Sequence, residues 1–155
     1  MKNDLKCAKK QSGVMLLEAL IAILIFSLGI MTVVAMQATS VKLTGDAKYR
    51  SDATMVANQL IGQMWASGLP LAQLKTDYET DGAAYLVWLN ELVNSKMLPG
   101  VALADETMKP QVSIIDAADA TGGRVTVTIF WRTPQMSAPD RHRLVVVSQI
   151  MRNKV

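Results

Sequence analysis

A 23-residue apolar stretch dominates the N-terminal part of the chain. It runs from Val14 to Met36, and its only interruptions are Glu18, Ser27, Gly29 and Thr32. An α-helix of about 20 apolar residues is long enough to cross the hydrocarbon core of a bilayer. The pattern therefore excludes an ordinary soluble domain and predicts a membrane-spanning helix.

Helix-forming residues continue beyond the apolar stretch. No proline occurs between Val14 and Ser67, so we predict a single long helix that ends before Gly68 and Pro70. Its middle part, residues 42–52, is polar nearly all round. Its last part has apolar residues at intervals of three and four, which form a stripe that another element must cover. The stripe consists of Ala53, Val56, Ala57, Leu60, Ile61, Met64 and Trp65.

The rest of the chain predicts a small body of mixed structure. Residues 68–82 are expected to form a loop, and Ala83 to Lys96 a short amphipathic helix that packs inward. Alternating or β-branched apolar residues then predict three strands, the third antiparallel to the second because their connection is short. Residues 121–123 are expected to form a turn between the first two strands. The predicted strands are Gln111 to Asp116, Arg124 to Arg132 and Leu144 to Met151.

These elements place the chain in the α+β class. We expect a long N-terminal helix, its first half transmembrane, packed on a small antiparallel β-sheet with one extra short helix.

Positive charge is concentrated before the apolar stretch. The first thirteen residues carry four lysines and one aspartate, which leaves 12 basic and 12 acidic residues for the rest of the chain. A neutral body lacks the clustered Lys and Arg of a nucleic-acid-binding surface, so no direct binding of nucleic acid is expected. Lysines before the stretch and balanced charges after it predict a cytoplasmic N-terminus and a body outside. The only cysteine, Cys7, lies before the stretch, so the body forms no internal disulfide.

A secretory signal peptide is an alternative for the same segment. Such a peptide has an apolar region of roughly 7 to 15 residues followed by a small-x-small cleavage site. The apolar stretch here is longer, and only the weak match Ala38-Thr39-Ser40 follows it. The pattern therefore favours a retained helix.

Glu18 is the one charged residue inside the apolar stretch. A charged side chain costs about 2.5 to 3.5 kcal/mol at the centre of a bilayer, so such residues are expected to have a partner. One interpretation places Glu18 at the cytoplasmic interface, paired with Lys9 or Lys10. The other depends on cleavage: cutting the Gly13–Val14 bond would create an α-amine one helical turn away, and the attraction would be strong in a low dielectric.

Residues 9–18, KKQSGVMLLE, resemble the class III signal of type IV prepilins and their pseudopilin relatives. The shared features are a short basic leader, a glycine before the cut, a long apolar helix and a glutamate at the fifth mature position. The resemblance implies that a membrane-embedded aspartyl peptidase, the prepilin peptidase, cuts after Gly13 and methylates the new N-terminus at Val14. It makes Glu18 the carboxylate that guides assembly. The first mature residue of the family is usually phenylalanine, and Val14 departs from that pattern.

The resemblance also implies a division of the chain. Residues 1–13 would be the leader, with Lys9 and Lys10 as its basic residues. Residues 14–36 would form the transmembrane and filament-core helix, 37–67 the second half of the long helix, and 68–155 the periplasmic body.

Assembly is implied in the same way. The mature subunit would wait in the inner membrane as a single-pass protein and then enter a pilus at the cell surface. There Glu18 would neutralise the amine of Val14 on a neighbouring subunit. Leu16, Leu20, Ile23 and Leu24 would pack in the filament core. The same four residues would serve equally well in a plain membrane anchor.

Further motifs resemble the PilV-type minor pilins, also called type IV pilus modification proteins. They include LEALIA at 17–22, RSDA at 50–53, ANQL at 57–60 and LPG at 98–100. The helix-kinking proline and C-terminal cysteine pair that are usual in major pilins are absent. The resemblance thus implies a minor subunit that initiates, assembles or modifies the fibre with other minor pilins and the major pilin. Alternatives are a minor pseudopilin of a type II secretion system and, from another class, a membrane-tethered periplasmic enzyme or receptor.

The sequence offers little for catalysis or for a metal. His142, the only histidine, is flanked by two arginines, which favours a solvated position at a strand edge. Asp77, Glu79 and Asp81 lack the later glutamate and central glycine of a calcium loop, so we interpret them as a solvated acidic loop. We therefore expect no catalytic residue, no metal and no cofactor. Three tryptophans lie on apolar stripes and are expected to pack in the core: Trp65, Trp88 and Trp131.

Overall fold

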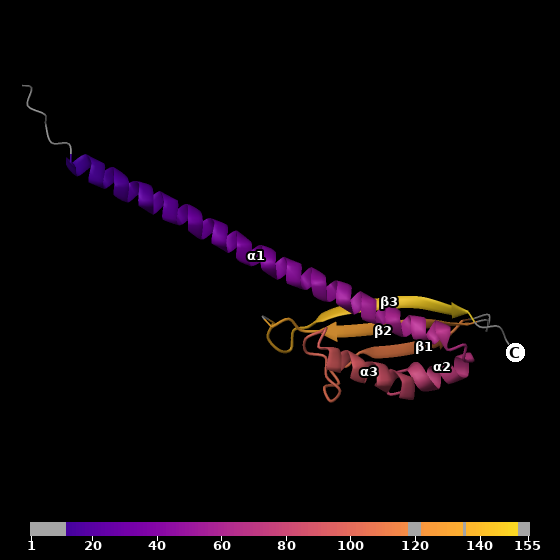
Figure 1. Cartoon of the computed structure of the whole chain (residues 1–155). Coiled ribbons are helices and arrows are strands. Elements are labelled where there is room, and N and C mark those ends of the chain that lie inside the picture. Colours follow the sequence, from indigo (N-terminus) through magenta and orange to yellow (C-terminus); the bar gives the residue numbers. More distant parts are fainter. Residues whose placement is uncertain (1–11, 118–121, 135, 152–155) are drawn as a thin grey trace, which may run out of the picture. The chain divides into compact units, whose positions relative to one another are not determined.

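The computed structural model describes residues 12–117, 122–134 and 136–151, in which three helices precede three strands (Figure 1). The helices are α1 (Ser12–Ala66), α2 (Leu71–Tyr78) and α3 (Ala83–Ser95). The strands are β1 (Gln111–Asp116), β2 (Gly122–Trp131) and β3 (His142–Met151). The chain divides into two compact units, one up to Thr44 and one from Gly45 onward, which we call the N-terminal segment and the body. Helix α1 contributes to both.

The predicted long helix is confirmed, because α1 is continuous over 55 residues. The absence of proline permits this, since every interior residue can donate its N–H to the helix ladder. All side chains from residue 13 to residue 44 are exposed, and the first half-buried position is Gly45. The change in exposure therefore coincides with the boundary between the N-terminal segment and the body.

The core of the body lies between the last part of α1, helix α3 and one face of the sheet. The apolar stripe of α1 is buried there, with Ala53, Leu60 and Met64 fully enclosed. Helix α3 contributes Tyr85, Trp88, Leu89 and Leu92, as its amphipathic pattern predicted. Helix α3 and the sheet therefore cover the apolar stripe of α1.

The sheet has the order β1-β2-β3, and both neighbouring pairs are antiparallel. Val127 in the central strand pairs with Val112 of β1 and with Val146 of β3. Side chains alternate along β2, so Val125, Val127 and Ile129 enter the core while their neighbours point away. The predicted antiparallel sheet is confirmed, and with it the α+β class.

The predicted loop at residues 68–82 is wrong, because helix α2 forms within it. Leu74 and Tyr78 are buried one turn apart on the inner face of α2. Pro70 precedes the helix at a position where a missing N–H is tolerated. The acidic residues of this segment favoured a solvated loop, and two apolar residues one turn apart are too short a pattern to predict a helix.

Gly122 and Gly123, expected in a turn, instead form the first two positions of β2. They pair with Met151 and Ile150 of β3. A Cβ on Gly122 would lie 2.1 Å from the carbonyl oxygen of Ile150, so only glycine allows the strands to approach this closely.

Two of the three tryptophans occupy the core. Trp88 and Trp131 are buried, as predicted, whereas the expectation for Trp65 is wrong because its side chain is 45% exposed. Trp65 lies at the margin of the stripe, one position past Met64 and close to the end of α1. At 100° per residue, this position has already turned away from the sheet.

We predict that Leu60→Ala destabilises the body by about 2 to 5 kcal/mol, because it leaves a cavity at a fully buried position. The matched control on the same helix is Met55→Ala, whose side chain is 52% exposed and whose loss should cost less than about 0.5 kcal/mol. Urea unfolding of the full chain in detergent, followed by tryptophan fluorescence, measures both. Equal effects of the two substitutions would contradict the described core.

Candidate functional site

The predicted cleavage point lies in the first turn of α1. The helix begins at Ser12, and Gly13 and Val14 are helical and exposed. Lys9 and Lys10 lie outside the described residues. Removal of residues up to Gly13 would make Val14 the first residue of the helix, where backbone N–H groups lack acceptors within the helix. The new α-amine would add a full positive charge to the positive end of the helix dipole.

Glu18 lies one helical turn after Val14, on the same face of α1. These two residues border a shallow surface groove together with Leu17, Ile21, Ala22 and Ile25. Within the described residues the carboxylate has no hydrogen bond or ion pair, and the proposed pairing with Lys9 or Lys10 falls outside that part of the chain. From Ser12 to Val41, Glu18 is the only charged residue.

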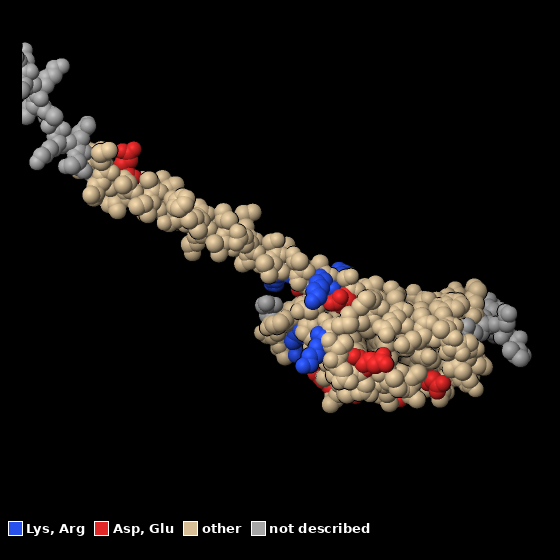
Figure 2. All heavy atoms as spheres, in the orientation of Figure 1, with Lys and Arg blue, Asp and Glu red and all other residues tan. Residues whose placement is uncertain are grey.

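The four predicted packing residues share a different face of α1. Leu16, Leu20, Ile23 and Leu24 fall within one sector of the helix, and the groove around Glu18 lies on the opposite side. All four are exposed, so the described chain itself supplies no partner for them. From Val14 to Val41 the helix surface is therefore uncharged apart from Glu18, and Figure 2 shows acidic atoms near the start of the described helix.

Four hydroxyls in the N-terminal segment, of Ser27, Thr32, Thr39 and Thr44, are satisfied by the helix itself. Ser27 donates to the carbonyl oxygen of Ile23 at 2.7 Å, and Thr32 donates to that of Leu28 at 3.0 Å. Thr39 continues the pattern two helical turns further on and donates to the carbonyl oxygen of Ala35 at 3.2 Å. These hydroxyls therefore need no water, and from Val14 to Met36 Glu18 is the only charged residue.

In the described part of the chain, one helix is long and apolar enough to cross a membrane, and it is α1. None of its most apolar 18-residue window is buried within the structure. An apolar surface of this extent marks a site of contact with lipid or with another protein. The candidate functional site is thus the exposed surface of the N-terminal segment, with Val14 and Glu18 at its start.

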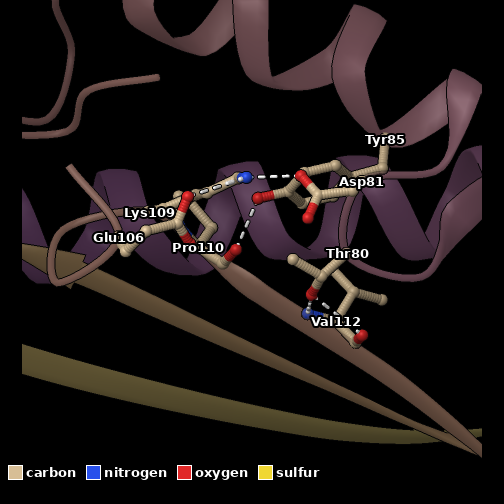
Figure 3. A network of polar contacts seen from close by, with 7 residues as sticks. All are labelled: Thr80, Asp81, Tyr85, Glu106, Lys109, Pro110 and Val112. Atoms are coloured by element: carbon tan, nitrogen blue, oxygen red, sulfur yellow. Dashed lines mark hydrogen bonds and ion pairs between the residues drawn. The ribbon is translucent and has the colours of Figure 1, made fainter. Parts of the chain in front are cut away.

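The body contains a polar network where the connection between α2 and α3 meets the chain before β1 (Figure 3). The ammonium group of Lys109, which is almost fully buried, donates to the Asp81 carboxylate and lies 3.4 Å from Glu106. The hydrogen bond to Asp81 is the main cause that raises the pKa of Lys109 above its ordinary value. Lys109 is therefore charged and paired with carboxylates.

Tyr85 anchors α3 in the same network. Its hydroxyl donates to the carbonyl oxygen of Pro110 at 2.5 Å. Burial raises the pKa of Tyr85, and the negative charges of Asp81 and Glu106 add to the effect. The neutral phenol is thus the form that the fold requires.

The interpretation of Asp77, Glu79 and Asp81 as a solvated acidic loop holds only in part, because Asp77 lies in α2 and the Asp81 side chain, although 61% exposed, is paired. Glu79 accepts a hydrogen bond from the backbone N–H of Ile114 at 2.9 Å, and Asp81 pairs with Lys109. Their roles depend on residues about 30 positions away, which the local sequence pattern does not show. Among the described residues, no group of three His, Cys, Asp or Glu side chains is placed to hold a metal ion.

His142 is the first residue of β3, as expected for a position at a strand edge. Its ring stacks on Trp131 with centroids 5.3 Å apart, and its Nε2 lies 4.0 Å from a carboxylate oxygen of Asp46. These contacts connect the start of β3 to the start of the body portion of α1. The imidazole thus serves packing between elements of the body.

Comparisons with protein-family models, with curated proteins and with solved structures each found no match. The geometry of the N-terminal segment and of the body therefore carries the functional argument.

We predict that Tyr85→Phe changes how stability depends on alkaline pH. The pKa of Tyr85 is higher in the folded protein than in the unfolded chain, so its contribution is complete below about pH 10 and is lost as pH rises further. Tyr85→Phe should cost about 0.5 to 1.5 kcal/mol at neutral pH through the lost hydrogen bond. Above pH 10 its stability should fall less steeply than that of the wild type.

The control for this prediction is Tyr49→Phe, at a half-buried position on α1. Urea unfolding between pH 8 and 11.5 compares the three proteins. A parallel alkaline decline of wild type and Tyr85→Phe would show that ionisation of Tyr85 is not coupled to folding.

Proposed function

We propose that this chain is a minor subunit of type IV pili, of the PilV type, that is anchored in the inner membrane before it enters the fibre. Prepilin peptidase cuts it between Gly13 and Val14 and methylates the new N-terminus. The mature subunit then takes part in the initiation, assembly or modification of pili with other minor pilins and the major pilin. The body faces the periplasm and reaches the cell surface with the fibre.

One observation carries the proposal: a lone carboxylate lies one turn after the proposed new N-terminus, on a helix whose apolar surface has no cover within the described chain. A plain membrane anchor accounts for the apolar surface but gives no reason for Glu18. Transmembrane segments seldom keep a charged group without a partner. An α-amine at Val14 supplies a charge of the right sign at the right end of the helix.

Processing is a hydrolysis. Water adds across the Gly13–Val14 peptide bond, which leaves a carboxylate on the leader and an amine on the mature chain. Methylation of that amine keeps its positive charge, because the product is still a basic secondary amine. The basic leader residues Lys9 and Lys10 hold this end of the chain on the cytoplasmic side until the cut is made.

Assembly exchanges lipid contacts for helix contacts, so apolar burial alone favours the fibre only weakly. An ion pair between Glu18 of one subunit and the amine of Val14 on a neighbour adds a term that lipid cannot supply. Because both charges lie at fixed positions along the helix, the pair also sets the axial offset between subunits. Leu16, Leu20 and Ile23, on the opposite face, would pack against further helices in the filament core.

We predict that Gly13→Ala leaves the chain at precursor size, because the peptidase depends on the glycine before the cut. Gly29→Ala is the matched control, since both glycines are exposed on α1 with open space around a new Cβ. Intact mass of the membrane-extracted proteins should show the thirteen leader residues retained only in Gly13→Ala. Normal removal of the leader from that variant would refute the assignment of the cleavage site.

We predict that Glu18→Gln is processed normally but is at least tenfold depleted from sheared pili. A tenfold loss corresponds to about 1.4 kcal/mol of assembly free energy, a modest value for an ion pair in low dielectric. Gln37→Ala, another change at an exposed polar position of α1, should leave pilus incorporation unchanged. Wild-type amounts of Glu18→Gln in pili would exclude the role of this carboxylate in register.

A further inference from the structure

The two edges of the sheet differ in how their backbone groups are satisfied. At the β1 edge, the N–H of Val112 donates to the Thr80 hydroxyl at 2.9 Å, and the N–H of Thr80 donates back to the Val112 carbonyl at 3.2 Å (Figure 3). The N–H of Ile114 donates to the Glu79 carboxylate at 2.9 Å. The connection between α2 and α3 therefore closes this edge to any further strand.

The β3 edge is open within the described residues, because β3 pairs with β2 alone. The strand is ten residues long and contains no proline, glycine or lysine. Soluble proteins usually protect such an edge, since its unpaired N–H and C=O groups are a template for another strand. Val145, Val147 and Met151, all exposed, extend the apolar character of this strand on the face away from the core.

A second copy of the chain cannot continue the sheet in the simplest way. Head-to-tail addition would place β3 of one copy beside β1 of the next, and the β1 edge is already occupied by Glu79 and Thr80. Parallel pairing of β3 with another β3 would bring Arg143 beside its own copy, which like-charge repulsion disfavours. What remains for two copies is an antiparallel β3–β3 pair around a twofold axis.

The antiparallel pair conflicts with the single direction of a fibre, a step that rests on the proposed function. β3 runs in the same direction as the body portion of α1, because His142 at its start contacts Asp46 near the start of that portion. At the other end of β3, Ile150 pairs with Gly123, which lies against Leu71 just after α1. Antiparallel pairing would therefore run the body portions of α1 in the two copies in opposite directions, whereas the proposed fibre adds its subunits in one direction.

Charge indicates what kind of strand fits. β3 contains no acidic residue, and Arg143 near its start is exposed. Just before β3, the guanidinium group of Arg141 lies 4.1 Å from the ring centre of Phe130, which is opposite Arg143 in the register. Two arginines thus gather at the start of the open edge, where carboxylates of an incoming strand would be paired.

We propose that β3 accepts an extended segment of a different polypeptide, which adds a fourth strand to the sheet. The segment carries a carboxylate opposite Arg143 and small or β-branched side chains opposite Val145 and Val147. In a fibre, the body would therefore bind a dissimilar subunit through this edge, while its β1 edge ends the sheet.

Hydrogen exchange tests the proposal on the full chain in two states. Amides of residues 142–151 are compared in the purified detergent-solubilised protein and in native membranes or sheared fibres. Those directed away from β2 should exchange at least tenfold more slowly in the native state, whereas residues 111–116 of β1 should be equally protected in both. Equal exchange of β3 in the two states would overturn the proposal.

Photocrosslinking identifies the occupant of the edge. With a photoreactive phenylalanine analogue in place of Val147, peptide mapping should find an acidic extended segment of another polypeptide joined at this position. A product of twice the chain's own mass would instead establish a pair of copies and overturn the proposal.

A charge on the edge provides the matched variants. Val147→Lys should abolish the extra protection of β3 because lysine on an edge strand opposes further pairing. Val87→Lys, at an equally exposed position on α3, should preserve it. Retained protection in Val147→Lys would contradict strand addition, provided that both variants unfold at the wild-type urea concentration. Because no outcome here depends on leader removal, failure of the edge proposal is distinguishable from failure of the proposed function.

Discussion

About thirty successive residues of α1 expose mostly apolar side chains, and this surface is the constraint on which the molecule depends. The same helix continues into a body where its apolar stripe is buried against α3 and the sheet. Helix α1 therefore needs one environment for its apolar surface before Gly45 and another for its buried stripe after Gly45. The first of them must come from lipid or from other chains, since the described chain does not provide it. Glu18 favours other chains over lipid alone as that environment, because lipid leaves its carboxylate without a partner.

The body follows from the need to cover the second part of α1. Sheet and α3 enclose the stripe, and the connection between α2 and α3 closes the β1 edge through Glu79 and Thr80. The ion pair between the buried Lys109 and the exposed Asp81 fixes that connection to the chain before β1. The two edges of the sheet therefore differ, since β1 is closed and β3 is open within the described residues, and this difference is the basis of the proposed addition of an unlike strand at β3.

The sequence predicted the long helix because no proline interrupts it, and three strands because their apolar residues alternate with polar ones or are β-branched. Helix α2 was missed, since its eight residues bury only Leu74 and Tyr78. The placement of Val14 and Glu18 on one helix face followed directly from their spacing. The hydrogen bond from Ile114 to Glu79 could not be predicted, because it joins residues 35 positions apart that no local pattern connects.

Intact mass of the wild-type protein, recovered separately from membranes and from sheared fibres, tests the central claim most directly. The account predicts a chain that begins at Val14, lacks the thirteen leader residues and carries one added methyl group in both fractions. A chain that retains its initiator methionine within the fibres would contradict it, because Glu18 would then have no new α-amine to bind.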